Sequence, residues 1–167
     1  PAPIPLMEVE QSVRSKLPGF YYSHPKFRPG NGPRLLYHGD KRQEAIVLTH
    51  GFTDSPHYMQ DVAQVYYKEG FNVVLPLLPA HGLKKPNEAI RDEYLDIKWR
   101  ANIDSSVAVA RLMGERVSIG GFSTGGALGL NKILRHPGMI EGGLFLFSGA
   151  LSLGKWLDAL GDTEALV

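Results

Sequence analysis

The sequence contains no cysteine among its 167 residues, and this absence removes several kinds of chemistry. Disulfide bonds, thiolate metal sites and cysteine nucleophiles are all excluded within this chain. The absence does not identify a compartment, because cytoplasmic and exported proteins can both lack cysteine. The chain starts at Pro1 rather than at a methionine, so we expect that something preceded it, such as an initiator methionine, a tag or a signal peptide.

The sequence also lacks an excess of either charge. Its 18 Lys and Arg residues and 17 Asp and Glu residues give a formal net charge of +1. The basic residues are scattered along the chain, which is not the pattern of a nucleic-acid-binding protein or of a segment that binds anionic membranes. No apolar run approaches the ~20 residues of a transmembrane helix. We therefore expect one soluble domain with a hydrophobic core.

The segment from Val117 to Leu128 is the most informative part of the sequence. A short apolar strand is followed by Gly121-Phe122-Ser123-Thr124-Gly125 and then by apolar residues at helical spacing. This order is typical of a nucleophile elbow, a sharp strand-to-helix turn that exposes a serine hydroxyl. Glycines two residues before and after the serine avoid collisions with the turn and with the neighbouring strand. Ser123 is therefore the candidate nucleophile.

A Gly-x-Ser-x-Gly pattern alone is weak, because this chain has 19 glycines and many such matches are ordinary turns. The flanking segments favour the functional interpretation, since residues 116–119 are strand-like and the helical spacing continues until Pro137. The helix directs its unpaired N–H groups at Ser123, where they stabilise developing negative charge. Its apolar positions are Ala127, Leu128, Leu130, Ile133 and Leu134.

Strands and helices alternate along residues 35–150, which predicts an α/β sandwich around a mostly parallel sheet. The predicted strands cover residues 35–37, 45–48, 71–75, 116–119 and 144–147, the last of them buried. Besides the helix after Ser123, one helix begins at Ser55-Pro56 and stops at Gly70, and another spans roughly residues 97–113. The first of these is expected to bury Tyr58, Met59, Val62, Ala63 and Tyr66, and the second Trp99, Ile103, Val107 and Ala110.

The chain outside this alternating region has its own expected organisation. Residues 1–34 are rich in proline and glycine and are expected to form an irregular lead-in, with one short helix near residues 9–17. Residues 35–150 are expected to form the N-terminal part of the core. Residues 151–167 are expected to begin a cap or lid segment.

The loop after the strand at residues 45–48 suggests the second half of a catalytic site. Acyl transfer develops an oxyanion, and loss of one of the N–H donors that stabilise this oxygen costs about 3–4 kcal/mol. Gly51 allows close approach of the main chain, so the N–H of Phe52 is one predicted donor and that of Thr124 is the other. Alone, His50-Gly51 would be interpreted as an ordinary turn at a strand end. The nucleophile elbow later in the chain makes the functional interpretation the better one.

Three segments in this order, HGFTDSP, LPLLPAHG and GGFSTGG, resemble the α/β-hydrolase superfamily, in particular carboxylesterases and monoacylglycerol lipases. The resemblance covers about residues 35–150. It implies an α/β-hydrolase sandwich that cleaves a small acyl ester through an acyl-enzyme on Ser123, without a metal or organic cofactor. Ala80 stands where the family more usually has glycine, which affects the shape of the loop. The implied oxyanion donors are Phe52 and Thr124, and the implied cleft-lining residues are His50, Gly51, His81 and Phe122.

The sequence departs from the family at the rest of the catalytic triad. In this superfamily the acid and the histidine follow the serine in the chain, after later strands. His136 is the one histidine after Ser123, but about 13 helical residues place it roughly 20 Å away, too far to act as the base. His50 and His81 lie on other loops, where a structural hydrogen bond is the expected role. Asp158, Asp162 and Glu164 are interpreted as solvated charges on the cap segment.

We therefore expect the catalytic acid and base to lie beyond Val167, in a C-terminal remainder that completes the sheet. Without a base, the 167-residue chain should retain only an oxyanion-hole contribution of about 10³–10⁴ over water. Thioesterase, acyltransferase and carbon–carbon bond hydrolase activities stay open on the same scaffold. So does a non-catalytic binding module that keeps the pocket but lacks the base, or an inactive fragment.

Overall fold

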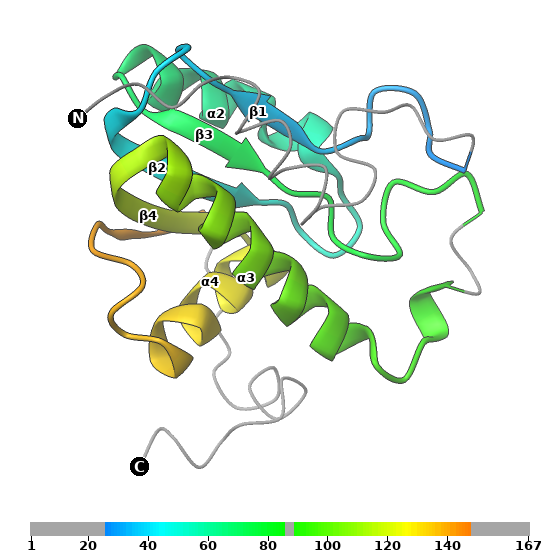
Figure 1. The fold of residues 1–167 in the computed structure, drawn as a ribbon. Coiled ribbons are helices and arrows are strands. Elements are labelled where there is room, and N and C mark those ends of the chain that lie inside the picture. Colours follow the sequence, from blue (N-terminus) through cyan, green and yellow to red (C-terminus); the bar gives the residue numbers. More distant parts are fainter. Residues whose placement is uncertain (1–25, 86–88, 148–167) are drawn as a thin grey trace.

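The structure is a computed structural model and describes residues 26–85 and 89–147 (Figure 1). The described strands form one sheet in the order β1-β3-β2-β4-β5. β1 pairs antiparallel with β3, and the other neighbouring strands pair in parallel. The predicted α/β class with a mostly parallel sheet is therefore confirmed. The strands are β1 (Arg34–Leu36), β2 (Arg42–Thr49), β3 (Asn72–Leu75), β4 (Gly114–Phe122) and β5 (Leu144–Phe147).

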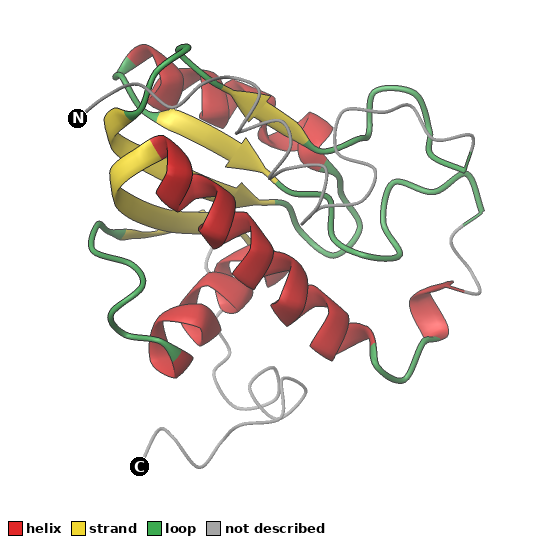
Figure 2. Cartoon of the chain, in the orientation of Figure 1, coloured by secondary structure: helices red, strands yellow, loops and turns green. Residues whose placement is uncertain are grey.

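Helices cover both faces of the sheet (Figure 2). α3 (Leu95–Met113) and α4 (Thr124–Arg135) pack on one face, and α2 (Gln60–Lys68) packs on the other. Successive side chains of a strand point to opposite faces, so β2 contributes to two separate cores. Ala45 and Val47 join the core under α3 and α4, whereas Ile46 and Leu48 join the core under α2. Both faces of β2 are covered, which explains its continuous apolar run.

The first helical segment after β2 starts where the sequence predicts. The Ser55 Oγ accepts a hydrogen bond from the His57 N–H at 3.3 Å, and Pro56 takes the first helical position. The chain first forms a short 3₁₀ turn, η1 (Pro56–Met59), and only then continues as α2. Met59 and Ala63 are buried as predicted, but Tyr58 is 69% exposed. The tighter 3₁₀ turn changes the angular spacing and rotates Tyr58 away from the buried face.

The predicted burial is confirmed for α3 but not for the end of α4 or for β5. The predicted face of α3 is buried at Trp99, Ile103, Val107 and Ala110. Leu134, near the end of α4, is 38% exposed, although Lys132 in the same turn is buried. β5 is predicted to be buried but is partly exposed throughout, because within the described residues it is the outer strand of the sheet and pairs on one side with β4.

The remaining predictions lie partly outside the described residues. This applies to the helix near residues 9–17 and to the cap segment with Asp158, Asp162 and Glu164. No described helix has the length and apolar character needed to cross a membrane.

Candidate active site

The two motif-bearing loops leave the sheet side by side. β2 and β4 are parallel neighbours, and their register places Thr49 opposite Gly121. The chain then continues into residues 50–55 on one strand and into residues 123–124 on the other. An ideal Cβ built on Gly51 would lie 3.4 Å from the Phe122 Cδ1, so the two loops touch. The sheet therefore brings together the two segments that the sequence predicted as one site.

Ser123 occupies a strained turn between β4 and α4. Its backbone has φ 51° and ψ −111°, and Ala80 is the other described non-glycine residue with positive φ. Such a conformation costs an L-residue on the order of 1–3 kcal/mol and is concentrated at functional sites. The Ser123 N–H approaches the Phe147 oxygen at 3.4 Å, and its carbonyl accepts the Ala127 N–H at 3.1 Å. The side chain is half-buried at the end of the strand.

The two glycines around Ser123 allow main-chain atoms to approach closely. A Cβ on Gly125 would lie 2.2 Å from the Thr49 oxygen, and one on Gly121 would lie 2.5 Å from the Gly125 carbonyl carbon. These are the collisions with the neighbouring strand and with the turn that the sequence predicted. The turn can form only because both positions lack a side chain.

His50 is fully buried beneath the loop after β2. Its Nδ1 lies 2.8 Å from the Gly51 oxygen, and its Nε2 accepts the Leu78 N–H at 3.1 Å. A carbonyl requires a donor and an amide N–H requires an acceptor, so the ring is neutral with its proton on Nδ1. Burial lowers the pKa of His50 to about 4, with the Gly51 carbonyl opposing and His81 adding to this shift. With no exposed surface, His50 supports the loop from behind instead of lining the cleft as the sequence predicted.

The hydrogen bond from His50 fixes the peptide that links Gly51 to Phe52. The Gly51 oxygen also accepts the Asp54 N–H at 3.2 Å. In a trans peptide the C=O and N–H point in opposite directions, so the Phe52 N–H faces away from His50. Among the described residues, no acceptor takes the N–H of Phe52 or of Thr124. Neither amide is therefore paired within the described part of the chain.

His81 and Trp99 hold the same loop from the side. The His81 Nε2 is in hydrogen-bond contact with the Phe52 oxygen, and its Nδ1 lies 3.0 Å from the Pro79 oxygen. The Trp99 Nε1–H donates to the Pro79 oxygen at 2.9 Å. The Phe52 ring packs edge-on against the rings of His81 and Trp99. The sequence indicated Trp99 only as a buried helix residue, because its partner lies 20 residues away on another loop.

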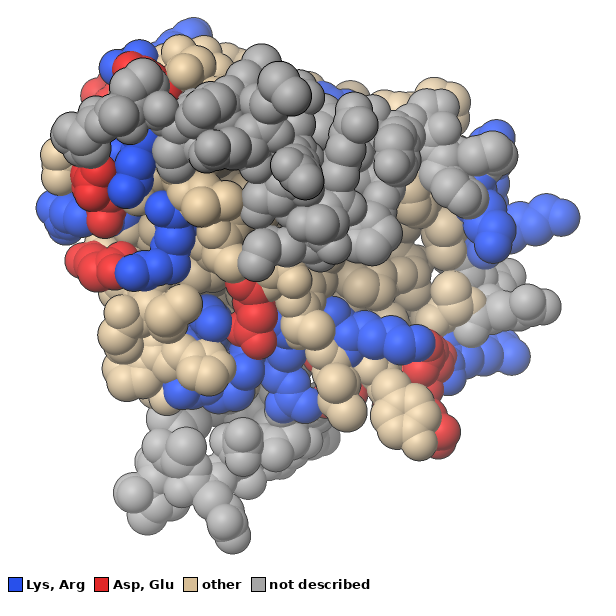
Figure 3. Space-filling view, in the orientation of Figure 1, with Lys and Arg blue, Asp and Glu red and all other residues tan. Residues whose placement is uncertain are grey.

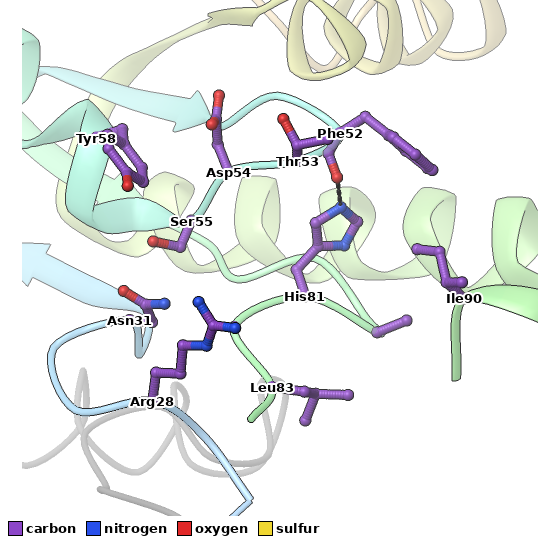
Figure 4. Close-up of a pocket in the computed structure, with 12 residues that line it drawn as sticks. Arg28, Asn31, Phe52, Thr53, Asp54, Ser55, Tyr58, His81, Leu83 and Ile90 are labelled. Atoms are coloured by element: carbon purple, nitrogen blue, oxygen red, sulfur yellow. Dashed lines mark hydrogen bonds between the residues drawn. The ribbon is translucent and has the colours of Figure 1, made fainter. Parts of the chain in front are cut away.

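The other residues predicted at the cleft lie in different places around these loops. Phe52 and Phe122 expose 42% and 40% of their surface, so both present apolar area on the two adjoining loops. His81 lines a cavity of about 340 Å³ (Figure 4), whose lining does not include Ser123. Ala80 has φ 69°, which accounts for the family's more usual glycine at this position.

No described histidine contacts Ser123. His50 and His81 bond to backbone groups, as the structural interpretation predicted. His38 contacts the Tyr67 oxygen, and His57 contacts Gln60. His136 follows the last turn of α4, at the opposite end of the helix from Ser123. Within the described ranges, no cluster of His, Asp and Glu has the arrangement of a metal site.

Comparisons with known proteins give partial matches. No family model matches the chain. A thermostable monoacylglycerol lipase of Bacillus sp. (strain H-257) is 30% identical over 101 residues, which are 60% of this chain and 39% of that protein. The chain therefore spans about two fifths of the length of this curated relative.

Solved structures extend the comparison. A structure from a study of LipS and LipT, two metagenome-derived lipolytic enzymes, superposes with a TM-score of 0.63 at 25% identity, covering 72% of this chain and 46% of that one. Epoxide hydrolase A from Mycobacterium thermoresistibile superposes with a TM-score of 0.53 at 21% identity, covering 68% of this chain and 34% of that one. The second likeness concerns the fold alone.

Proposed function

From the α/β-hydrolase fold of this chain, we propose that the protein hydrolyses carboxylic esters with Ser123 as the nucleophile. The observation that carries the proposal is the strained backbone of Ser123 at the turn from β4 to α4. This turn adjoins a second loop whose Phe52 amide has no acceptor among the described residues. We infer that this amide and the N–H of Thr124 face the Ser123 hydroxyl, an arrangement that suits acyl transfer.

The proposed reaction has two halves. In the first, the Ser123 Oγ attacks the ester carbonyl while a general base accepts its proton, and the N–H groups of Phe52 and Thr124 stabilise the oxyanion. The intermediate collapses, the alkoxide leaves with the proton from the base, and an acyl-enzyme remains on Ser123. In the second half, the base activates a water molecule, which releases the carboxylic acid and restores the serine.

The general base and its acid partner are proposed to lie outside the described residues. The proposal rests on the described histidines, each of which has a partner other than Ser123. His50 is also unsuitable, because its Nε2 lone pair is occupied by the Leu78 N–H. A base supplied by a later part of the chain would follow the order serine, acid, histidine.

An ester with an apolar acyl group is the proposed substrate class. The exposed rings of Phe52 and Phe122 offer apolar surface on the two loops that flank Ser123. The similarity to a monoacylglycerol lipase and to a structure from a study of lipolytic enzymes favours the same class. Thioesters and acyl transfer to other alcohols use the same intermediate, so they are alternative substrates within this proposal.

The proposal is tested by ester turnover in matched serine variants of the full-length protein, which includes the segment proposed to supply the general base. We expect Ser123→Ala to lower kcat/KM for 4-nitrophenyl butyrate by roughly a thousandfold or more, because the nucleophile is removed. Ser105→Ala, on α3, should leave turnover unchanged. Equal turnover in Ser123→Ala and in the unmodified protein would contradict the proposal. A parallel series with the matching thioester and with an alcohol acceptor separates esterase, thioesterase and acyltransferase activity.

A further inference from the structure

The cavity of Figure 4 lies beside the candidate active site. The cavity of about 340 Å³ is lined by residues of three segments, and its volume is within the usual range for small-molecule sites. The lining residues are Arg28 and Asn31 from the first segment, residues 52–55 and Tyr58 from the second, and residues 80–83 and Ile90 from the third. The first segment is fixed against the third, because the Arg28 N–H donates to the Gly82 oxygen at 2.8 Å and Phe27 pairs with Leu83. Part of the N-terminal segment that the sequence predicted to be irregular therefore forms one side of this cavity.

The lining of the cavity has a polar side and an apolar side (Figure 4). The side chains of Arg28, Asn31, Ser55 and Tyr58 lie together on one side. Phe52 and Ile90 lie on the other side, with the carboxylate of Asp54 directed away from Arg28. This arrangement suits a ligand with a polar head and a short apolar tail.

The two segments that pair at one edge of the cavity carry basic residues, while Asp54 is the one acidic residue of the lining. Residues 26–34 and 79–85 together contain five Lys and Arg residues and no Asp or Glu. The pairing of Lys26, Phe27 and Arg28 with residues 82–84 gathers several of these cations at one edge, where Figure 3 also shows blue side chains. Charges that looked scattered in the sequence thus become clustered in the fold. Arg28 forms no ion pair with an acidic residue of the described ranges.

We propose that this cavity binds a small amphiphilic monocarboxylic acid in its ionised form. The guanidinium of Arg28 presents paired N–H donors that match the two oxygens of a carboxylate. The Asn31 amide and the hydroxyls of Ser55 and Tyr58 offer further hydrogen bonds to the head, and the apolar tail packs toward Phe52 and Ile90. The cavity shares Phe52 with the proposed active site but does not include Ser123, so binding does not require the nucleophile.

The experiment measures binding of sodium hexanoate by isothermal titration calorimetry. We expect Arg28→Gln to weaken hexanoate binding by roughly tenfold or more, because a charge-assisted hydrogen-bond pair is lost. Lys84→Gln removes a nearby exposed cation that does not line the cavity and should change the dissociation constant by less than about threefold, since a screened surface charge contributes little. Hexan-1-ol, which has the same tail without the charge, should bind at least about tenfold more weakly than hexanoate. Ser123→Ala should bind hexanoate as the unmodified protein does.

The opposite outcomes overturn the proposal. Hexanoate affinity that is unchanged in Arg28→Gln, or lost in Ser123→Ala, would place the ligand elsewhere. Equal weakening by Arg28→Gln and Lys84→Gln would indicate diffuse attraction of anions, including anionic surfaces, in place of a site. Arg28→Lys keeps the charge but not the paired donors, and we expect intermediate affinity. Circular dichroism of each variant verifies that the fold is retained.

Discussion

The two loops of the candidate site are held in place by different forces. The turn at Ser123 depends on close contacts between main-chain atoms, which Gly121 and Gly125 permit. The loop that contains Phe52 depends on hydrogen bonds from buried imidazole rings to its carbonyl oxygens. The first loop should therefore be sensitive to added side-chain volume and indifferent to pH. The second should tolerate volume better and should depend on the protonation of His50.

The largest stability effect is expected at Gly125. The Cβ of Gly125→Ala would lie 2.2 Å from the Thr49 oxygen, so β2 and α4 must separate. We expect a loss of roughly 3 kcal/mol in the free energy of unfolding, together with a loss of ester turnover. Urea unfolding followed by circular dichroism measures the first quantity.

Gly129→Ala is the matched control for this prediction. Its Cβ would meet the nearest atom, the Ile119 Cγ1, at 3.4 Å, which is an ordinary contact. The substitution also gains up to about 1 kcal/mol of helix propensity, so we expect unchanged or slightly higher stability. Equal stability of the two variants would show that the close approach at Gly125 does not hold the turn.

An effect of similar size, but confined to acid, is expected at His50. The pKa of His50 is lowered from 6.5 to about 4 in the folded protein, so between these values the unfolded chain binds more protons. Its contribution to stability is complete above pH 6.5 and is lost as the pH falls from there through about 4. The total loss is on the order of 3 kcal/mol. His50→Asn, which cannot take up this proton, should flatten the dependence of the unfolding free energy on pH in this window.

His57→Asn serves as the control for the acid prediction. His57 is exposed and contacts Gln60, so we expect its replacement to leave the slope of stability against pH as in the unmodified protein. A slope that survives in His50→Asn would mean that the Phe52 loop does not depend on a neutral His50.

The smallest effect is expected at Thr124. Its buried Oγ1 has no hydrogen-bond partner in the described part of the chain, and the proposed oxyanion donor is its main-chain N–H. Thr124→Val keeps the shape and the N–H, so kcat/KM should stay within about threefold of the unmodified protein. A hundredfold loss would show instead that the hydroxyl takes part in catalysis.

Local patterns in the sequence predicted one of these loops better than the other. The glycine spacing around Ser123 is encoded within five residues, so the strand, the turn and the reason for both glycines are readable. The support of the Phe52 loop comes from Leu78, His81 and Trp99, which lie far along the chain. Periodicity carries no information about such contacts. For the same reason the sequence predicts His50 in the cleft, whereas the structure has it buried beneath the loop.

Errors in burial have a similar origin. Tyr58 fits a helical stripe, but a 3₁₀ turn precedes α2 and changes the spacing. The pairing of residues 26–28 with 82–84 joins a proline-rich segment to a loop, and neither has a strand pattern. The cluster of basic residues that results is a property of the tertiary structure alone.

Covalent labelling of the serine hydroxyl tests the central proposal most directly. A fluorophosphonate forms a bond from phosphorus to the nucleophilic oxygen and releases fluoride, and this reaction requires an activated serine. In the full-length protein, which includes the proposed general base, we expect tryptic peptide mass spectrometry to find the adduct on Ser123, and labelling to vanish in Ser123→Ala. Labelling of a different residue, or ester turnover that persists while Ser123 stays unmodified, would contradict the account.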